Sequence, residues 1–249
     1  MALLHVNFRS QALQLAMGMD VIIPEKAQYP TPTERKEYPV LYLLHGLSDD
    51  QSAWHRKTRI EEYVNGKDLI VVMPTTHRAF YTNTVSGYKY FDFVSKELPA
   101  ICASMFPIST KREDTFAAGL SMGGYGAFKL GVLCHDKFAA VASLSGAVDV
   151  AAIMDRNTSP EFFSVFGENT RGSENDIIAQ LEKLIAEGAS LPRFYQACGT
   201  EDFLYLSNTA FRDRFKDRID LTYEEGPGVH NWDFWDEYIR HVLKWLPIK

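Results

Sequence analysis

The segment GLSMG, residues 119–123, places a single serine, Ser121, between two glycines. Gly-x-Ser-x-Gly is the pattern of a nucleophile elbow, in which a strand, a sharp turn and a helix hold one hydroxyl in an exposed position. The apolar segment 115–120 has the pattern of a buried strand, and residues 125–133 have that of a helix. Glycine at 119 and 123 removes Cβ atoms that would collide in such a turn. The alternative, a glycine-rich turn with an incidental serine, is disfavoured by this strand–turn–helix order.

A serine hydroxyl is a weak nucleophile unless a base removes its proton. In the elbow topology an acid and a histidine follow the serine in the chain. Three histidines lie after Ser121: His135 ends the helix after the elbow, His241 lies within the last helix, and His230 lies in the loop GPGVHN. Of the three, only His230 follows the end of a strand, where a base could reach the serine. We therefore predict that His230 is the base.

Asp202 directly follows the apolar strand 193–199 and precedes a helix, one strand before the loop of His230. This is the usual place for the acid that holds the imidazole tautomer and stabilises the imidazolium. Glu201 is adjacent, and at the start of a helix either carboxylate could instead complement the helix dipole. Asp149, after the preceding strand, is the rival acid. We predict Asp202.

Acyl transfer also needs backbone N–H groups that stabilise an oxyanion. Met122 follows the serine at the start of a helix, where the dipole favours negative charge. In proteins with this elbow the loop after an earlier strand, here 40–44, supplies a second N–H, and Leu47 is the candidate. His45 in the same loop precedes the nucleophile in the chain, so we expect it to pack or hydrogen-bond there.

Short apolar runs that end in glycine or proline recur along the chain, with the continuous hydrophobicity of strands buried on both faces. They cover residues 40–46, 69–74, 115–120, 138–146 and 193–199. Helical patterns separate them, most clearly at 88–106, 203–218 and 231–246. An opening hairpin is expected at 2–9 and 13–23, followed by a polar loop at 24–39. Strands that alternate with helices predict an α/β fold with a central, mostly parallel twisted sheet and helices on both faces.

We expect a single domain over residues 1–249, with a small helical, cap-like insertion near 150–190. About forty residues separate two strands there, far more than a usual connection. Four aromatic side chains could narrow an acyl pocket, and the alternative is that they belong to the core. They are Phe162, Phe163 and Phe166 of the insertion, and Trp232 after the histidine loop.

The net charge of −6 and the pI near 5.7 disfavour nucleic acid and anionic membranes as partners. No apolar run approaches the roughly 18 residues of a membrane span, and the N-terminal segment lacks the pattern of a secretion signal. Cys102, Cys134 and Cys198 show no metal-ligand spacing, so we expect buried free thiols in a reducing compartment. We predict a cytoplasmic protein with a small-molecule substrate and with neither metal nor organic cofactor. Homo-oligomer formation stays open.

Three motifs, HGLSDDQSAW (45–54), GLSMGGYGAF (119–128) and HNWDFW (230–235), resemble the esterase D family of α/β-hydrolases. That family includes S-formylglutathione hydrolases, feruloyl and acetyl-xylan esterases, bacterial short-chain tributyrin-type esterases and mycolyltransferases of the antigen 85 type. The resemblance spans residues 40–246 and implies the α/β-hydrolase fold. It also implies roles for five residues: Ser121 as nucleophile, Asp202 as acid, His230 as base, and the amides of Leu47 and Met122 as the oxyanion hole.

The loop after the first parallel strand departs from formylglutathione hydrolases, because Ser48, Asp49 and Asp50 stand in place of their threonine–cysteine pair. The resemblance is therefore greatest to short-chain serine carboxylesterases, and it implies hydrolysis of acetyl to butyryl esters, acetylated sugars included. Acyl transfer to another acceptor and thioester hydrolysis of the S-formylglutathione type are the alternatives. A non-catalytic binding module is disfavoured, because all three catalytic residue types are present in order.

Overall fold

The computed structural model describes residues 1–25, 37–156 and 159–248. An eight-stranded sheet has the order β1-β2-β4-β3-β5-β6-β7-β8. The strands are β1 (Ala2–Arg9), β2 (Ala16–Ile23), β3 (Val40–Leu44), β4 (Ile70–Pro74), β5 (Thr115–Leu120), β6 (Ala140–Leu144), β7 (Arg193–Gly199) and β8 (Leu221–Gly226). β1 and β2 form the expected antiparallel hairpin, β2 also pairs antiparallel with β4, and β3 to β8 are parallel. Most of the polar loop predicted at 24–39 lies outside the described residues.

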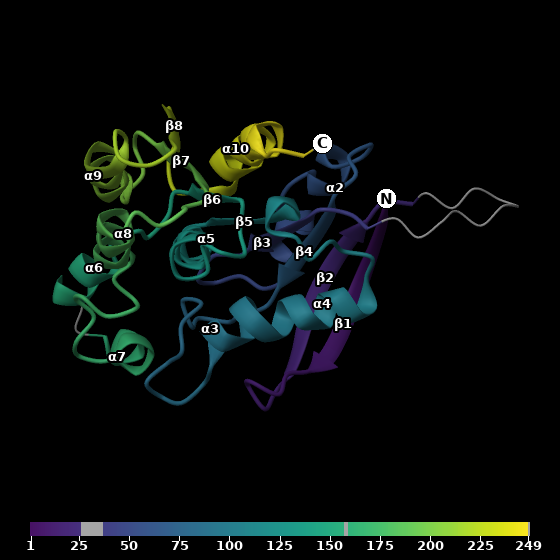
Figure 1. Cartoon of the computed structure of the whole chain (residues 1–249), viewed down its shortest axis with the longest axis horizontal. Helices are drawn as coiled ribbons and strands as arrows, with labels where there is room; N and C mark the ends of the chain where they lie inside the picture. Colours follow the sequence, from purple (N-terminus) through teal and green to yellow (C-terminus); the bar gives the residue numbers. More distant parts are fainter. Residues whose placement is uncertain (26–36, 157–158, 249) are drawn as a thin grey trace, which may run out of the picture.

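Helices cover both faces of the sheet (Figure 1). On one face α1 (Ala53–Lys57), α2 (Ile60–Tyr63) and α10 (Trp232–Trp245) pack over Leu41 and Leu43 of β3. On the other face α4 (Leu98–Met105), α5 (Met122–Leu133), α8 (Ile177–Ala186) and α9 (Tyr205–Phe215) share a core with Tyr42 and Leu44. Because alternate side chains of one strand are buried on opposite faces, the central strands are apolar throughout, as their sequences predict.

The helix predicted over 88–106 is interrupted. It begins as α3 (Tyr90–Asp92), passes through a π-helical turn (Phe93–Glu97) and continues as α4. Pro99 gives a physical reason, because its nitrogen cannot donate to the carbonyl of Ser95 and its ring crowds that carbonyl. A wider π turn before the proline accommodates both effects. A 3₁₀ turn (Arg112–Asp114) then leads into β5.

The insertion between β6 and β7 contains α6 (Val150–Arg156), α7 (Pro160–Phe166) and α8. Figure 1 shows these helices grouped with α9 beyond one end of the sheet. α8 buries Ile177 and Leu181 in the core that it shares with α5. On its outer side Glu182 accepts hydrogen bonds from Arg214 (2.6 Å) and Arg218 (2.6 Å), which joins α8 to α9. The insertion is therefore packed against the body of the fold.

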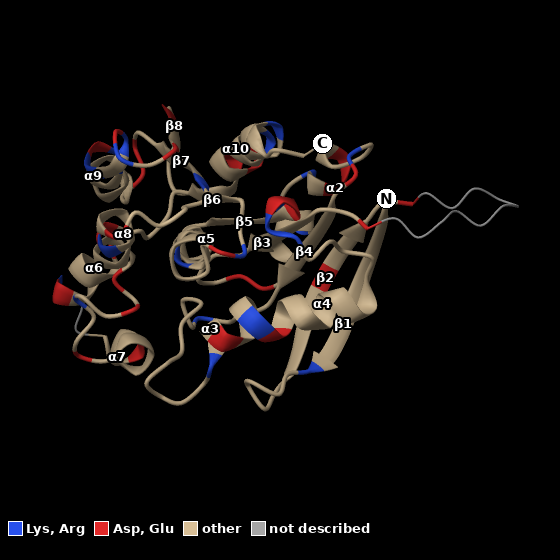
Figure 2. Ribbon diagram, viewed as in Figure 1, with Lys and Arg blue, Asp and Glu red and all other residues tan. Residues whose placement is uncertain are grey.

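Acidic and basic residues lie next to one another on elements such as α9 (Figure 2). Cys102, Cys134 and Cys198 are buried free thiols, as expected from the sequence. Within residues 1–25, 37–156 and 159–248, none of the helices combines the length and the apolar character needed to cross a bilayer.

Candidate active site

The backbone of Ser121 has the strained conformation expected of a nucleophile elbow. Its φ is 53° and its ψ is −116°, at the junction between β5 and α5. A Cβ at Gly119 would overlap the backbone of Gly123, and a Cβ at Gly123 would lie 2.5 Å from the carbonyl oxygen of Leu44. The two glycines therefore allow the strand and the helix to approach closely, which agrees with the role predicted for them.

Ser121, His230 and Asp202 form one hydrogen-bonded line. The Nε2 atom of His230 is 3.0 Å from Ser121 Oγ, and its Nδ1 atom is 2.8 Å from Asp202 Oδ2. Because an ionised carboxylate only accepts hydrogen bonds, Nδ1 carries the hydrogen and Nε2 is left to accept from the serine hydroxyl. The three side chains singled out in the sequence are thus brought together from the ends of β5, β7 and β8.

The side chain of Asp202 is completely buried, with 0% of its surface exposed. Burial by itself would raise its pKa. Hydrogen bonds from His230 and from the backbone N–H of Leu204, 2.8 Å from Oδ1, outweigh burial, and the net effect lowers the pKa of Asp202. The carboxylate is therefore ionised at neutral pH, which is the state that orients an imidazole.

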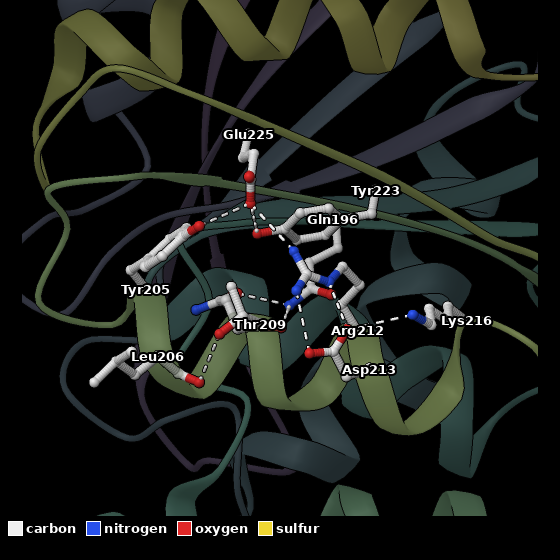
Figure 3. A network of polar contacts seen from close by, with 10 residues as sticks. Gln196, Tyr205, Leu206, Thr209, Arg212, Asp213, Lys216, Tyr223 and Glu225 are labelled. Atoms are coloured by element: carbon white, nitrogen blue, oxygen red, sulfur yellow. Dashed lines mark hydrogen bonds and ion pairs between the residues drawn. The ribbon is translucent and has the colours of Figure 1, made fainter.

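A polar network fixes the helix that follows Asp202. In Figure 3 the carboxylate of Glu225 on β8 accepts hydrogen bonds from Tyr205 (3.1 Å), Tyr223 (3.0 Å) and Arg212 (3.2 Å). Tyr205 and Arg212 belong to α9, whereas Glu225 belongs to the strand that leads into the histidine loop. The network therefore holds the element after the acid against the element before the histidine.

The rival acid and bases have other partners. The carboxylate of Asp149 accepts from a backbone N–H at the start of α6 (2.9 Å) and so caps that helix. His135 lies against a backbone carbonyl oxygen at 3.2 Å. His241 is 2.6 Å from a carboxylate oxygen of Glu224. The structure therefore places none of these three side chains in the line that contains Ser121.

The two amides predicted to form the oxyanion hole lie beside the serine. Met122 is the first residue of α5, so its N–H has no acceptor within the helix. Leu47 lines the same cavity as Ser121, and a Cβ on the preceding Gly46 would lie 3.9 Å from the serine Cβ. Neither amide donates a hydrogen bond to another described residue. Both are therefore free to bind an oxygen of a substrate.

His45 holds the loop that carries Leu47. Its Nδ1 atom donates to the carbonyl oxygen of Gly46 (2.7 Å), and its Nε2 atom accepts from the backbone N–H of Thr76 (3.0 Å). The hydroxyl of Tyr81 donates to the carbonyl oxygen of His45 (2.9 Å). Burial lowers the pKa of His45 to about 4, so the ring is neutral at neutral pH and keeps both hydrogen bonds. These contacts agree with a role within the loop.

A cavity of about 440 Å³ opens beside Ser121 and His230. Its other lining residues are Gly46, Leu47, Ser48, Asp49, Leu120, Phe203, Asn231, Trp232 and Trp235. Of the four aromatic residues singled out in the sequence, Trp232 lines this cavity. Sequence reasoning missed Phe203 and Trp235, whose ring centroids lie 4.5 and 4.9 Å from that of His230. Closeness in sequence to Asp202 and His230 is the signal that could have found them.

The cavity wall carries one acidic side chain, Asp49. Its carboxylate is half-buried, and burial raises its pKa. The lining contains neither lysine nor arginine, so the described wall offers no permanent positive charge. A substrate with a carboxylate near this wall would be repelled, whereas hydroxyl groups could donate hydrogen bonds to Asp49.

Phe162, Phe163 and Phe166 do not line this cavity. The rings of Phe162 and Phe166 lie 5.3 and 5.2 Å from the ring of Phe80 and pack into the main core. Phe163 is partly exposed and lines a separate hollow that includes Met154. Phe162 and Phe166 therefore belong to the core, which was the alternative to an acyl pocket in the insertion, because α7 packs both rings inward. The aromatic wall of the cavity comes from Trp232 and Trp235 of α10 and from Phe203 instead.

Comparisons with known proteins agree with this geometry. The Esterase family model matches residues 10–246. The chain is 34% identical over 261 residues to an acetyl esterase of Caldicellulosiruptor saccharolyticus, with 99% of this chain and 98% of that protein covered.

Two solved structures from Staphylococcus aureus are also similar, each with 98% of both chains covered. The fluorophosphonate-binding serine hydrolase FphF superposes with a TM-score of 0.91 at 32% identity. The S-formylglutathione hydrolase FrmB superposes with a TM-score of 0.88 at 33% identity. These matches confirm the α/β-hydrolase fold and the resemblance to the esterase D group. The chain belongs to the Esterase family and is a carboxylic ester hydrolase.

Proposed function

We propose that this esterase hydrolyses short-acyl esters through a catalytic triad of Ser121, His230 and Asp202. The observation that carries the proposal is the pair of hydrogen bonds made by His230, one to each partner, at the wall of an open cavity. A histidine in this position can take the serine proton while the carboxylate stabilises the imidazolium.

In the first half of the proposed reaction, Ser121 Oγ attacks the ester carbonyl carbon and His230 Nε2 takes its proton. The backbone N–H groups of Leu47 and Met122 stabilise the negative charge on the carbonyl oxygen. The bond to the alcohol then breaks, and the alcohol leaves with the proton from His230. Water attacks the acyl-enzyme with His230 as base, which releases the carboxylic acid and restores the serine.

Replacement of Ser121 by alanine tests the triad. Turnover of p-nitrophenyl acetate should fall by about 10⁴-fold or more, because the nucleophile is lost while the fold is kept. A fluorophosphonate probe should label the wild type and not the variant. Ser104→Ala, at an exposed position of α4, is the matched control and should behave as the wild type. Undiminished turnover by Ser121→Ala in a folded protein would rule out the assignment.

The preference for a short acyl group rests on the aromatic wall and on the acetyl esterase relative. Trp232 and Trp235 lie nearly perpendicular to each other, with ring centroids 5.3 Å apart, and leave a rigid boundary to the cavity. We expect kcat/KM for p-nitrophenyl esters to be highest for acetyl to butyryl groups and to fall for octanoyl. A preference for octanoyl esters would contradict the short acyl site.

Asp49 favours an uncharged alcohol, such as a sugar hydroxyl, as the leaving group. The similarity to FrmB makes thioester hydrolysis of the S-formylglutathione type a second candidate. Glutathione carries two carboxylates, which an acidic wall disfavours. We expect acetylated sugars to be turned over faster than S-formylglutathione, and Asp49→Asn to narrow that difference. The reverse order in the wild type would favour the second candidate. Product analysis with an added alcohol acceptor separates hydrolysis from acyl transfer.

A further inference from the structure

Three metal-ligating side chains meet on elements outside the proposed active site. The Nδ1 atom of His5 on β1 is 2.8 Å from Asp20 Oδ1 on β2, and the Nε2 atom of His55 on α1 is 2.6 Å from Asp20 Oδ2. The ligand atoms of the three residues all lie within 4.8 Å of one another. Strand pairing explains why His5 lies beside Asp20, because the two residues are directly opposite each other in the β1–β2 hairpin. Figure 1 shows these two strands side by side.

The carboxylate of Asp20 is only 3% exposed, and its ion-pair partners among the described residues are His5 and His55. A buried carboxylate is stabilised by hydrogen-bond donors and more strongly by a positive charge beside it. An imidazole supplies such a charge only when it is protonated. A divalent cation held by both rings and the carboxylate would instead supply positive charge while the rings stay neutral.

The donor set selects the kind of cation. Two imidazoles and one carboxylate suit Zn²⁺ and related first-row metals, whereas Mg²⁺ and Ca²⁺ prefer oxygen ligands throughout. Ligand atoms around tetrahedral Zn²⁺ lie roughly 3.3 Å apart. Because the ligand atoms here already lie within 4.8 Å of one another, shifts of about 1.5 Å or less would bring them to that spacing. The side chain of His5 is 66% exposed and free to make such a shift. His55 also lines a surface cavity with Arg59, Glu61 and Glu62, so its ring can be reached from solvent.

We propose that His5, Asp20 and His55 form a Zn²⁺ site, with its fourth position open to water. The ion would join the β1–β2 hairpin, at the edge of the sheet, to α1. This replaces the expectation of a chain without a metal site, because ligands from three separate elements leave no spacing motif in the sequence. Since the ligand set forms only in the folded chain, binding stabilises the fold.

Titration of tag-free protein, stripped with a chelator, tests the site. Calorimetry should show one Zn²⁺ bound per chain, and Co²⁺ should give the visible absorption bands of a tetrahedral site. At a hundred-fold excess of free Zn²⁺ over Kd, the Tm should rise by roughly 5–10 °C. His5→Ala and His55→Ala should each weaken Zn²⁺ binding by at least about tenfold.

The matched control is His241→Ala, which removes a histidine paired with a single carboxylate on another part of the fold. It should leave the affinity for Zn²⁺ unchanged. His5→Ala changes an exposed side chain on an edge strand, so it decides the question even if His55→Ala does not fold. The proposal is overturned if the wild type binds no stoichiometric Zn²⁺, if His5→Ala binds it as tightly, or if His241→Ala loses as much. None of these results depends on esterase activity.

Discussion

Glu201 and Gly228 are joined by two hydrogen bonds. The backbone N–H of Glu201 donates to the carbonyl oxygen of Gly228 (3.0 Å), and the N–H of Gly228 donates to the Glu201 carboxylate (2.5 Å). Each residue lies within two positions of a member of the proposed triad, Asp202 or His230. A Cβ at the nearby Gly199 would overlap the carbonyl oxygen of Gly228. The acid and the base are therefore carried by two loops that pack directly on each other.

This relationship predicts that Glu201 positions His230 without contacting substrate. Glu201→Ala removes the acceptor of the Gly228 N–H, and we expect kcat to fall roughly 10- to 100-fold, because a small displacement of the base is costly. KM should change little. Glu201→Gln keeps a carbonyl acceptor and should retain most of the activity. Steady-state kinetics on p-nitrophenyl acetate distinguishes them, and equal kcat values for Glu201→Ala and the wild type would contradict the prediction.

Asp202→Asn should lower kcat by about 10⁴-fold with little change in fold stability. An amide can donate to Nδ1, so the imidazole would carry its hydrogen on Nε2 and could not accept the serine proton. The measurement is the single-turnover rate on an activated acetyl ester. Asp149→Asn is the control, since that side chain caps α6 and should leave kcat unchanged. A residual kcat within tenfold of the wild type would exclude Asp202 as the acid.

Gly123→Ala should prevent the elbow from forming correctly. Its Cβ would lie 2.5 Å from the carbonyl oxygen of Leu44, a backbone atom that cannot move without the strand. We expect a loss of about 2–3 kcal/mol in the free energy of unfolding, together with loss of activity. Gly18→Ala is the control, because its Cβ would meet only the flexible side chain of Gln51, at 3.0 Å. Thermal unfolding measures both, and equal Tm values would contradict the steric account.

The side-chain amine of Lys129 is buried in the core. Its Nζ atom donates to Thr82 Oγ1 (2.9 Å) and Asn175 Oδ1 (2.6 Å), and it lies 4.7 Å from the ring centre of Phe91. Burial lowers its pKa to about 7, from a usual value of 10.5. Between these two pH values the unfolded chain binds a proton at Lys129 that the folded chain does not bind. Stability should therefore rise with pH in this window.

The stability difference between the wild type and Lys129→Met measures this effect. From pH 7.5 to 9.5 we expect the difference to move in favour of the wild type by about 1–1.4 kcal/mol per pH unit. Urea unfolding at each pH gives the values. Lys244→Met, at an exposed position of α10, should show no comparable slope. A difference that stays constant with pH would show that Lys129 is charged in the folded protein throughout.

Much of the fold could be predicted because the signals are local. Apolar runs bounded by glycine or proline identify strands buried on both faces, and the elbow pattern identifies one junction between a strand and a helix. The break of the helix at 93–97 is different, because the sequence contains Pro99 but the response of the preceding turn depends on packing. The first and last residues of strands and helices also depend on packing, so the observed bounds differ from those expected from the sequence.

The line from Ser121 to Asp202 could be predicted because chain order in this topology restricts where the acid and the base can lie. The pocket could not be predicted equally well. Phe166 and Trp232 are both large aromatic residues near loops, and only the path of α7 decides that Phe166 turns into the core. His5 and His55 illustrate the same limit, because fifty residues of chain separate two rings that meet across a hairpin and a helix.

The main chain of Ser121 is held from several sides. Its N–H donates to Leu144 O (2.8 Å), and its carbonyl oxygen accepts from Tyr125 N–H (3.1 Å) and Ala147 N–H (3.1 Å). Laboratory evolution toward other esters would gain little from changes at the elbow, since any movement there breaks the sheet and the helix together. Useful diversity would instead have to accumulate at exposed side chains of the cavity wall. Phe203 is an example, because it is 77% exposed and lies outside the elbow.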